Sequence, residues 1–195
     1  MASDKYSALL EISASRKSRR DFIDKEVTPD LIEKIEQVAM TAPYASGRKN
    51  WEMLIVNDKK QIADLAQTVK DYVKSVEVNL NPDFKNEFLN YAKSFTNFES
   101  APLLIIPTYR ISKGMELMFE SIDEDTKQWD RDNFVKSISC VIMLVLLAAE
   151  SLNLASCPMT GPLIAEREFN KVLKIKKGRS VAAVIAIGYT NEKNG

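Results

Sequence analysis

The sequence of 195 residues contains no histidine. This absence excludes Ser-His-Asp and Cys-His nucleophilic catalysis, a histidine general base and zinc sites with histidine ligands. The two cysteines, Cys140 and Cys157, form no CxxC pair, so neither a disulfide framework nor a thiolate metal site is indicated. Without a histidine to activate it, Cys157 is interpreted as a buried structural thiol. Any reactive group must then come from elsewhere, most commonly from a bound cofactor.

An excess of charge of one sign is also lacking, because 27 Lys and Arg residues balance 27 Asp and Glu residues. A dedicated nucleic-acid-binding domain usually carries a basic excess. The longest apolar run, residues 140–149, is half of the roughly 20 residues that a membrane span needs. The N-terminus shows no basic region followed by an apolar stretch and a cleavage site. We therefore expect a cytoplasmic protein that binds neither nucleic acid nor a membrane.

Glycine is scarce, with six residues, and these match neither the GxGxxG nor the GxxxxGK[ST] nucleotide-binding pattern. A Rossmann or P-loop site is therefore not indicated. The acidic residues of 120–125 could in principle bind a metal, but they lie in a poorly patterned stretch and are interpreted as a solvated loop. We predict no metal site.

The apolar periodicity predicts one α+β domain over residues 1–195, with helices outnumbering strands. Residues 111–131 are interpreted as a loop or partly ordered insertion, and the apolar helix 134–152 should be covered on every side. Residues 157–162 are read as a turn. The other expected helices are 4–15, 29–42, 59–80, 84–95 and 166–175, and the expected strands are 51–56, 103–108 and 181–188.

A cluster of cations stands out in the segment ASRKSRRDF, at Arg16, Lys17, Arg19 and Arg20. Such a cluster is most often a solvated surface. Two neighbours favour an anion site for a small phosphorylated ligand: Ser18 adds a hydroxyl donor, and Phe22 supplies an apolar anchor. Arginine in a fixed geometry binds phosphate through two hydrogen bonds. A nucleic-acid arm is the weaker alternative, since residues 21–36 are rich in acids.

The segment CPMTG, residues 157–161, is the second candidate for a binding element. A turn with this composition presents backbone N–H groups at a fixed edge, where one of them could reach a planar ring. A simple tight connection explains the same residues equally well. From the residues alone, both interpretations stay open.

Taken together, the segments resemble the nitroreductase family of FMN-dependent oxidoreductases over nearly the whole chain. The first match is residues 16–22 (RKSRRDF) to the pattern Arg-Arg/His-Ser-x-Arg/Lys-x-Phe, followed by a looser match of residues 25–31 (KEVTPDL). The second is residues 42–51 (APYASGRKNW) before a strand. The third is residues 153–161 (NLASCPMTG), and the last is the closing strand with Gly188 and Tyr189.

This resemblance implies a three-layer α/β/α sandwich with a mixed central sheet, built as an intertwined homodimer that binds FMN at the subunit interface. It also implies the cofactor-binding residues, and it names no catalytic side chain. From one subunit these residues are Arg16, Lys17, Ser18, Arg20, Pro158, Met159, Thr160 and Gly161, with Lys193 near the C-terminus. Arg19, the remaining member of the cation cluster, is expected to be solvated. From the other subunit they are Pro43, Tyr44, Ala45 and Gly47.

The function that the resemblance implies is hydride transfer from NAD(P)H to FMN, and then to a nitroaromatic, quinone or similar acceptor by a ping-pong mechanism. The chain departs from the family's pattern at Gly47, Lys49 and Asn50, where the family has asparagine, glutamine and proline. These departures leave open an alternative, an FMN storage or sensor protein with little turnover. Asn97 is a further candidate for the flavin's polar edge.

Overall fold

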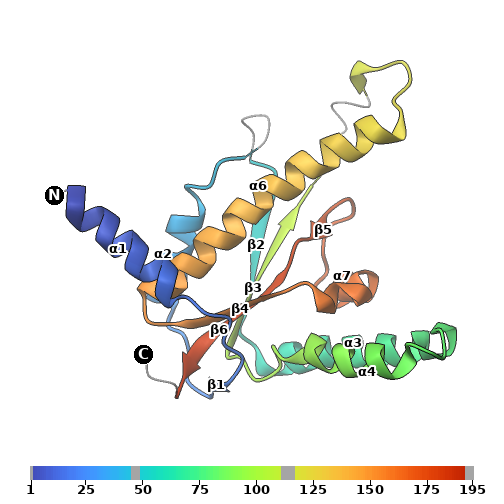
Figure 1. The fold of residues 1–195 in the computed structure, drawn as a ribbon, viewed down its shortest axis with the longest axis horizontal. Helices are drawn as coiled ribbons and strands as arrows, with labels where there is room; N and C mark the ends of the chain where they lie inside the picture. Colours follow the sequence, from blue (N-terminus) through green and yellow to red (C-terminus); the bar gives the residue numbers. More distant parts are fainter. Residues whose placement is uncertain (1, 45–48, 111–116, 192–195) are drawn as a thin grey trace.

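A six-stranded sheet lies between two layers of helices in the computed structural model, which describes residues 2–44, 49–110 and 117–191 (Figure 1). The strand order is β1-β6-β3-β2, with β4 paired to β6 and β5 paired to β3. The strands are β1 (Phe22–Ile23), β2 (Trp51–Val56), β3 (Leu103–Tyr109), β4 (Ala155–Met159), β5 (Ser180–Val181) and β6 (Val184–Thr190). This is the three-layer α+β architecture that the sequence predicts.

The pairings between these strands are antiparallel, where the family resemblance implies a mixed sheet, and the one parallel contact among the described residues is an isolated bridge between Ser18 and Ser156. Strand β3 is buried along its whole length. Its side chains alternate between the two faces of the sheet, as the pleat requires. Leu103 and Ile105 enter one core, and Leu104 and Ile106 enter the other. A continuous apolar run therefore indicates here a strand covered on both faces.

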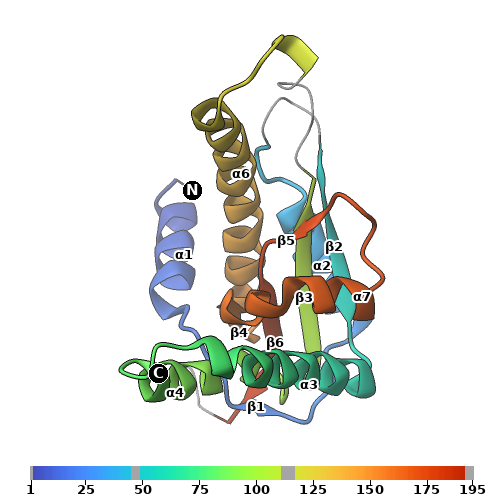
Figure 2. The same cartoon turned by 90° about the vertical axis from the view of Figure 1, so that its right-hand side faces the viewer.

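The helices divide between the two faces of the sheet, as the two views of the chain show (Figure 2). On one face lie α2 (Pro29–Ala39) and α6 (Glu124–Ser151), with α1 (Ala2–Ser15) beside the end of α6 (Figure 1). The other face carries α3 (Lys59–Val76), α4 (Lys85–Ala92) and α7 (Glu166–Val172). Short 3₁₀ segments are η2 (Glu77–Asn79), η3 (Lys93–Thr96) and η4 (Gly161–Ala165).

Helix α6 corrects two predictions. It begins at Glu124, so the interpretation of residues 111–131 as a loop is wrong over 124–131, while residues 111–116 lie outside the described part of the chain. The helix start is set by Asp123, whose carboxylate accepts a hydrogen bond of 2.6 Å from the Thr126 N–H. This capping contact holds the charged first turns in a helix although they have no apolar stripe.

The helix is also not covered on every side within one chain. Val135 is 38% exposed and Met143 is 50% exposed. Among the described helices, α6 alone is long and apolar enough to cross a membrane by length and composition. Its inner residues nevertheless pack with α2 and the sheet in one hydrophobic core. It is therefore a core helix with one open face.

Candidate functional site

The cation cluster borders a cleft of about 530 Å³. One wall is the extended segment between α1 and β1, and the other is the segment between η3 and β3. Ligand pockets in proteins commonly have volumes of about 300–1,000 Å³. The lining residues are Lys17, Ser18, Arg19, Arg20, Asp21, Thr96, Asn97, Glu99 and Ser100.

Positive charge in this cleft is open to a ligand. Arg16, Lys17 and Arg20 form no ion pair with any side chain in the described part of the protein. Of the two lining acids, Glu99 is held 2.7 Å from Lys70, so its charge is already balanced, while Asp21 forms no ion pair with a described residue. Lys17 and Arg20 in the lining, with Arg16 next to them in the chain, still outnumber Asp21, and this excess of positive charge has the chemistry of an anion site.

Arg19 differs from its neighbours in the cluster. The prediction that Arg19 is solvated is wrong, because its side chain is 9% exposed and paired with Glu150 at 3.2 Å. Its backbone N–H donates to the Ser156 carbonyl oxygen at 3.1 Å. The cluster thus divides into exposed and buried members, and Arg19 is the buried one.

The second wall of the cleft was mostly missed from the sequence. Asn97 was a candidate and lines the cleft, but Thr96, Glu99 and Ser100 belong to no motif. The Ser100 hydroxyl donates to the Arg20 carbonyl oxygen at 3.4 Å, which links the two walls. The one available signal for this wall in the sequence was a polar stretch directly before a buried strand.

Strand β4 brings the start of the second predicted binding element, Cys157, beside the cation cluster, while residues 158–161 are not among those that line the cleft. Burial raises the pKa of the Cys157 thiol, against the opposing influence of Arg20, Ser18 and Arg16, which surround it. The prediction of a turn over 157–162 is wrong at its start, because β4 pairs with β6 as far as Met159. Thr160 then leads into η4.

Gly161 at the start of η4 contacts the other wall through Phe95. A β-carbon at this position would overlap the Phe95 ring. That ring is buried and packs edge-on against Tyr91 and Phe88, at centroid distances of 4.9 and 6.4 Å. The packing therefore requires glycine at this position. The close contact holds the end of the 157–161 segment against η3, and the residues that follow Phe95 line the cleft.

Gly161→Ala should therefore destabilise the protein by about 1–3 kcal/mol, because the Phe95 ring has no free space to move into. The midpoint of thermal unfolding should fall by about 3–8 °C. The double variant Gly161→Ala/Phe95→Leu should recover part of the loss, since a smaller side chain relieves the overlap. A Gly161→Ala variant that melts like the wild type would contradict this packing.

The raised pKa of Cys157 predicts a dependence of stability on alkaline pH. The folded state favours the protonated thiol, so this contribution is complete below the ordinary thiol pKa and is lost as pH rises through the folded one. Above about pH 8.5, the ordinary thiol pKa, the stability measured by urea unfolding should fall more steeply with pH for wild type than for Cys157→Ala. Cys140→Ala, which removes an exposed thiol, is the control. Equal losses in wild type and Cys157→Ala would refute the assignment.

The residues expected to reach a partner's cofactor lie far from the cleft in their own chain. Asn50 pairs with Arg110 beyond one end of β3, while the cleft residues directly precede its other end. The seven residues of β3 span about 20 Å. Pro43 and Tyr44 are exposed and border no part of the cleft. Ala45, Gly47 and Lys193 lie outside the described residues.

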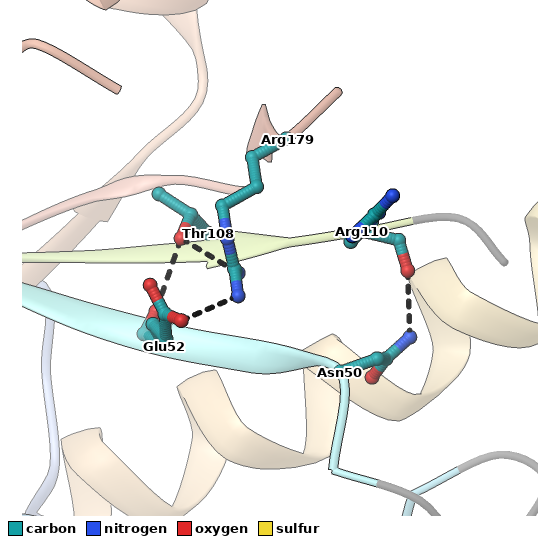
Figure 3. Close-up of polar contacts among 5 residues, drawn as sticks. All are labelled: Asn50, Glu52, Thr108, Arg110 and Arg179. Carbon is teal, nitrogen blue, oxygen red and sulfur yellow. Dashed lines mark hydrogen bonds and ion pairs between the residues drawn. The ribbon is translucent and has the colours of Figure 1, made fainter. Parts of the chain in front are cut away.

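Asn50, one of the departures from the family's pattern, is part of a polar cluster at the end of the β2–β3 ladder (Figure 3). Its side-chain amide donates to the Arg110 carbonyl oxygen at 3.0 Å. Arg179 donates to the Glu52 carboxylate at 2.6 Å and to the hydroxyl of buried Thr108 at 3.4 Å. The cluster ties the segment before β5 to the edge strand β2, so Asn50 has a structural role here.

Within the described residues, no group of three Cys, Asp or Glu side chains is arranged to hold a metal ion. The arrangement of the cleft instead fits a phosphorylated organic ligand. Lysine, arginine and hydroxyl donors stand on one wall and an amide on the other. A three-layer sandwich with such a cleft has the build of a cofactor-binding domain.

The chain belongs to the nitroreductase family, whose sequence profile matches residues 14–189. The Bacillus subtilis protein YfhC, provisionally named an NAD(P)H nitroreductase, is 22% identical over 187 residues, covering 96% of this chain and 87% of YfhC. A BluB-like flavoprotein from Clostridium difficile 630 superposes with a TM-score of 0.84 at 22% identity, covering 95% of this chain and 91% of that one. A nitroreductase with bound FMN from Desulfitobacterium hafniense superposes with a TM-score of 0.71 at 19% identity, covering 95% of this chain and 90% of that one.

Proposed function

We propose that the protein is an FMN-dependent NAD(P)H oxidoreductase of the nitroreductase type that acts on a small-molecule acceptor. The observation that supports this function most directly is a cleft of cofactor size lined by Lys17 and Arg20, with Arg16 next to them in the chain, none of them in an ion pair with another described residue. Bound FMN would supply the redox chemistry, taking electrons from NAD(P)H and passing them to a nitroaromatic, quinone or similar acceptor. This division of labour accommodates a chain without histidine.

The residues of the cleft fit the phosphate and the polar edge of FMN. Lys17, Ser18 and Arg20 offer charged and hydroxyl donors for the phosphate and the polar edge of the ring. Asn97 offers both a donor and an acceptor from the opposite wall, and this matches the mixed hydrogen-bonding pattern of a flavin pyrimidine. Cations near that edge stabilise negative charge that develops there during reduction. The protein's role is to hold FMN, to orient it and to polarise its ring, and no side chain has to donate a proton.

The proposed active form is a homodimer with FMN at the subunit interface. Asn50 and the cleft lie at opposite ends of β3, so residues 43–50 would complete a site only in a second copy. Helices α1 and α6 carry exposed apolar side chains suited to such an interface. They are Tyr6, Leu9 and Leu10 on α1, and Val135 and Met143 on α6.

The test is an absorption spectrum of the purified protein, followed by anaerobic addition of NADH or NADPH and steady-state turnover with a nitroaromatic. We expect flavin bands, bleaching by a reduced nicotinamide nucleotide, and acceptor-dependent oxidation. A protein that is colourless and cannot be reconstituted with FMN would refute the proposal. A yellow protein bleached by neither nucleotide would favour the storage or sensor alternative.

A further inference from the structure

Arg19 and Glu150 form a buried ion pair behind the exposed members of the cation cluster. Their side chains are 9% and 4% exposed, and they are separated by 131 positions in the sequence. Glu150 lies in the last turn of α6, where the helix carbonyls disfavour a negative charge. A carboxylate that is both buried and at a helix C-terminus needs a cation, and Arg19 is its ion-pair partner.

Arg19 contacts both elements that the connection between α6 and β4 joins. Its guanidinium meets Glu150, and its backbone N–H donates to the carbonyl oxygen of Ser156 in β4. Between these two partners the chain reverses on Asn153, at φ 57°, and the Leu154 N–H closes the helix on the Ala149 carbonyl oxygen at 2.9 Å. The end of α6 and the start of β4 therefore form a fixed frame for the cation cluster.

The pair decides which side chains face the cleft. Ser18 bridges Ser156 as a strand would, and in extended backbone successive side chains point to opposite sides. With its guanidinium held by Glu150, Arg19 borders the cleft only as a buried residue, whereas Ser18 and Arg20 line it with exposed side chains. A slip of one residue would reverse this pattern. The local sequence RKSRR specifies its own register poorly, because polar residues occupy every position.

A buried ion pair is weak evidence for stability, since apolar residues of similar volume are often as stable or more so. Its best-attested use is to select one register. The geometry points to Arg19 and Glu150 as positioning residues: their pair fixes residues 18–20 so that Ser18 and Arg20 present their donors to the ligand phosphate. This inference rests on the proposed function, because the phosphate is taken to be that of FMN.

The test compares binding of FMN and riboflavin, which differ by the phosphate alone, to apoprotein by fluorescence titration. In Arg19→Met/Glu150→Leu, the unfolding midpoint of the apoprotein should stay within a few degrees of wild type or rise. The preference for FMN over riboflavin should nevertheless fall about tenfold or more, the amount expected for one lost charge-assisted hydrogen bond. A purely structural role would move the midpoint and leave this preference unchanged.

Two further variants keep the outcome decisive. Glu77→Gln/Lys85→Gln removes an exposed ion pair of 2.9 Å on the other face of the sheet and should change neither quantity. If the apolar double variant does not fold, Glu150→Gln decides, because it removes the charge that holds Arg19 inward while keeping the shape. An unchanged FMN preference in folded variants would overturn the inference. A wild type that binds neither flavin would instead refute the proposed function.

Discussion

Arg16→Ala/Arg20→Ala should lose FMN while the apoprotein keeps its fold. Arg20 lines the cleft, both cations lie near Cys157, and neither forms an ion pair with another described residue. Hydrogen bonds to charged groups contribute about 1.5–3 kcal/mol each, so the double variant should lose about 3–6 kcal/mol of binding free energy. This corresponds to roughly a hundredfold to ten-thousandfold rise in the FMN dissociation constant.

The fold should be spared because neither side chain belongs to a core. Arg20 is exposed and Arg16 is half-buried, and surface substitutions of this kind usually change stability by about 0.5 kcal/mol or less. The matched control is Arg167→Ala/Lys171→Ala, which removes two exposed cations from α7 and should leave FMN binding unchanged. FMN affinity within threefold of wild type in the Arg16/Arg20 variant would contradict the assignment of the site.

The fold was predictable where the sequence carries a strong local pattern. The helix start at Pro29 is confirmed, because proline at the first helical position suits the geometry of an N-terminus, although the Thr28 hydroxyl makes no capping hydrogen bond. Strand β3 is confirmed over its whole predicted length and extends one residue further, to Tyr109. Asp58 adds a local cap to α3 by accepting from the Gln61 N–H at 2.6 Å. These signals lie within a few residues of the structure that they specify.

The site was predictable only in part, because its decisive contacts are long-range. Four cations of similar chemistry follow one another, and nothing local tells which one turns inward. That choice depends on Glu150, which lies in a helix that the sequence alone placed as an apolar core element. The wall from Thr96 to Ser100 was missed for the same reason, since its role comes from the strand pairing that carries it to the cluster.

Met143→Asp should convert the protein to a monomer and thereby weaken FMN binding. Met143 is 50% exposed in the middle of the open face of α6, in a stretch that is otherwise part of the apolar core. In a two-fold symmetric dimer, one substitution places a carboxylate at the interface twice. An uncompensated buried charge costs about 3–5 kcal/mol, so the dimer dissociation constant should rise by at least about a hundredfold.

The loss of FMN is the informative part of this experiment, because Met143 borders no part of the cleft within its own chain. If residues 43–50 of a second copy complete the site, dissociation must open it, and FMN affinity should depend on protein concentration. Light scattering gives the oligomeric state, and titration with FMN at several protein concentrations shows whether FMN binding is coupled to dimerisation. Val78→Asp is the control, since Val78 is 85% exposed in η2 on the opposite helical layer. A monomeric Met143→Asp protein that binds FMN as tightly as wild type would show that each chain builds its site alone.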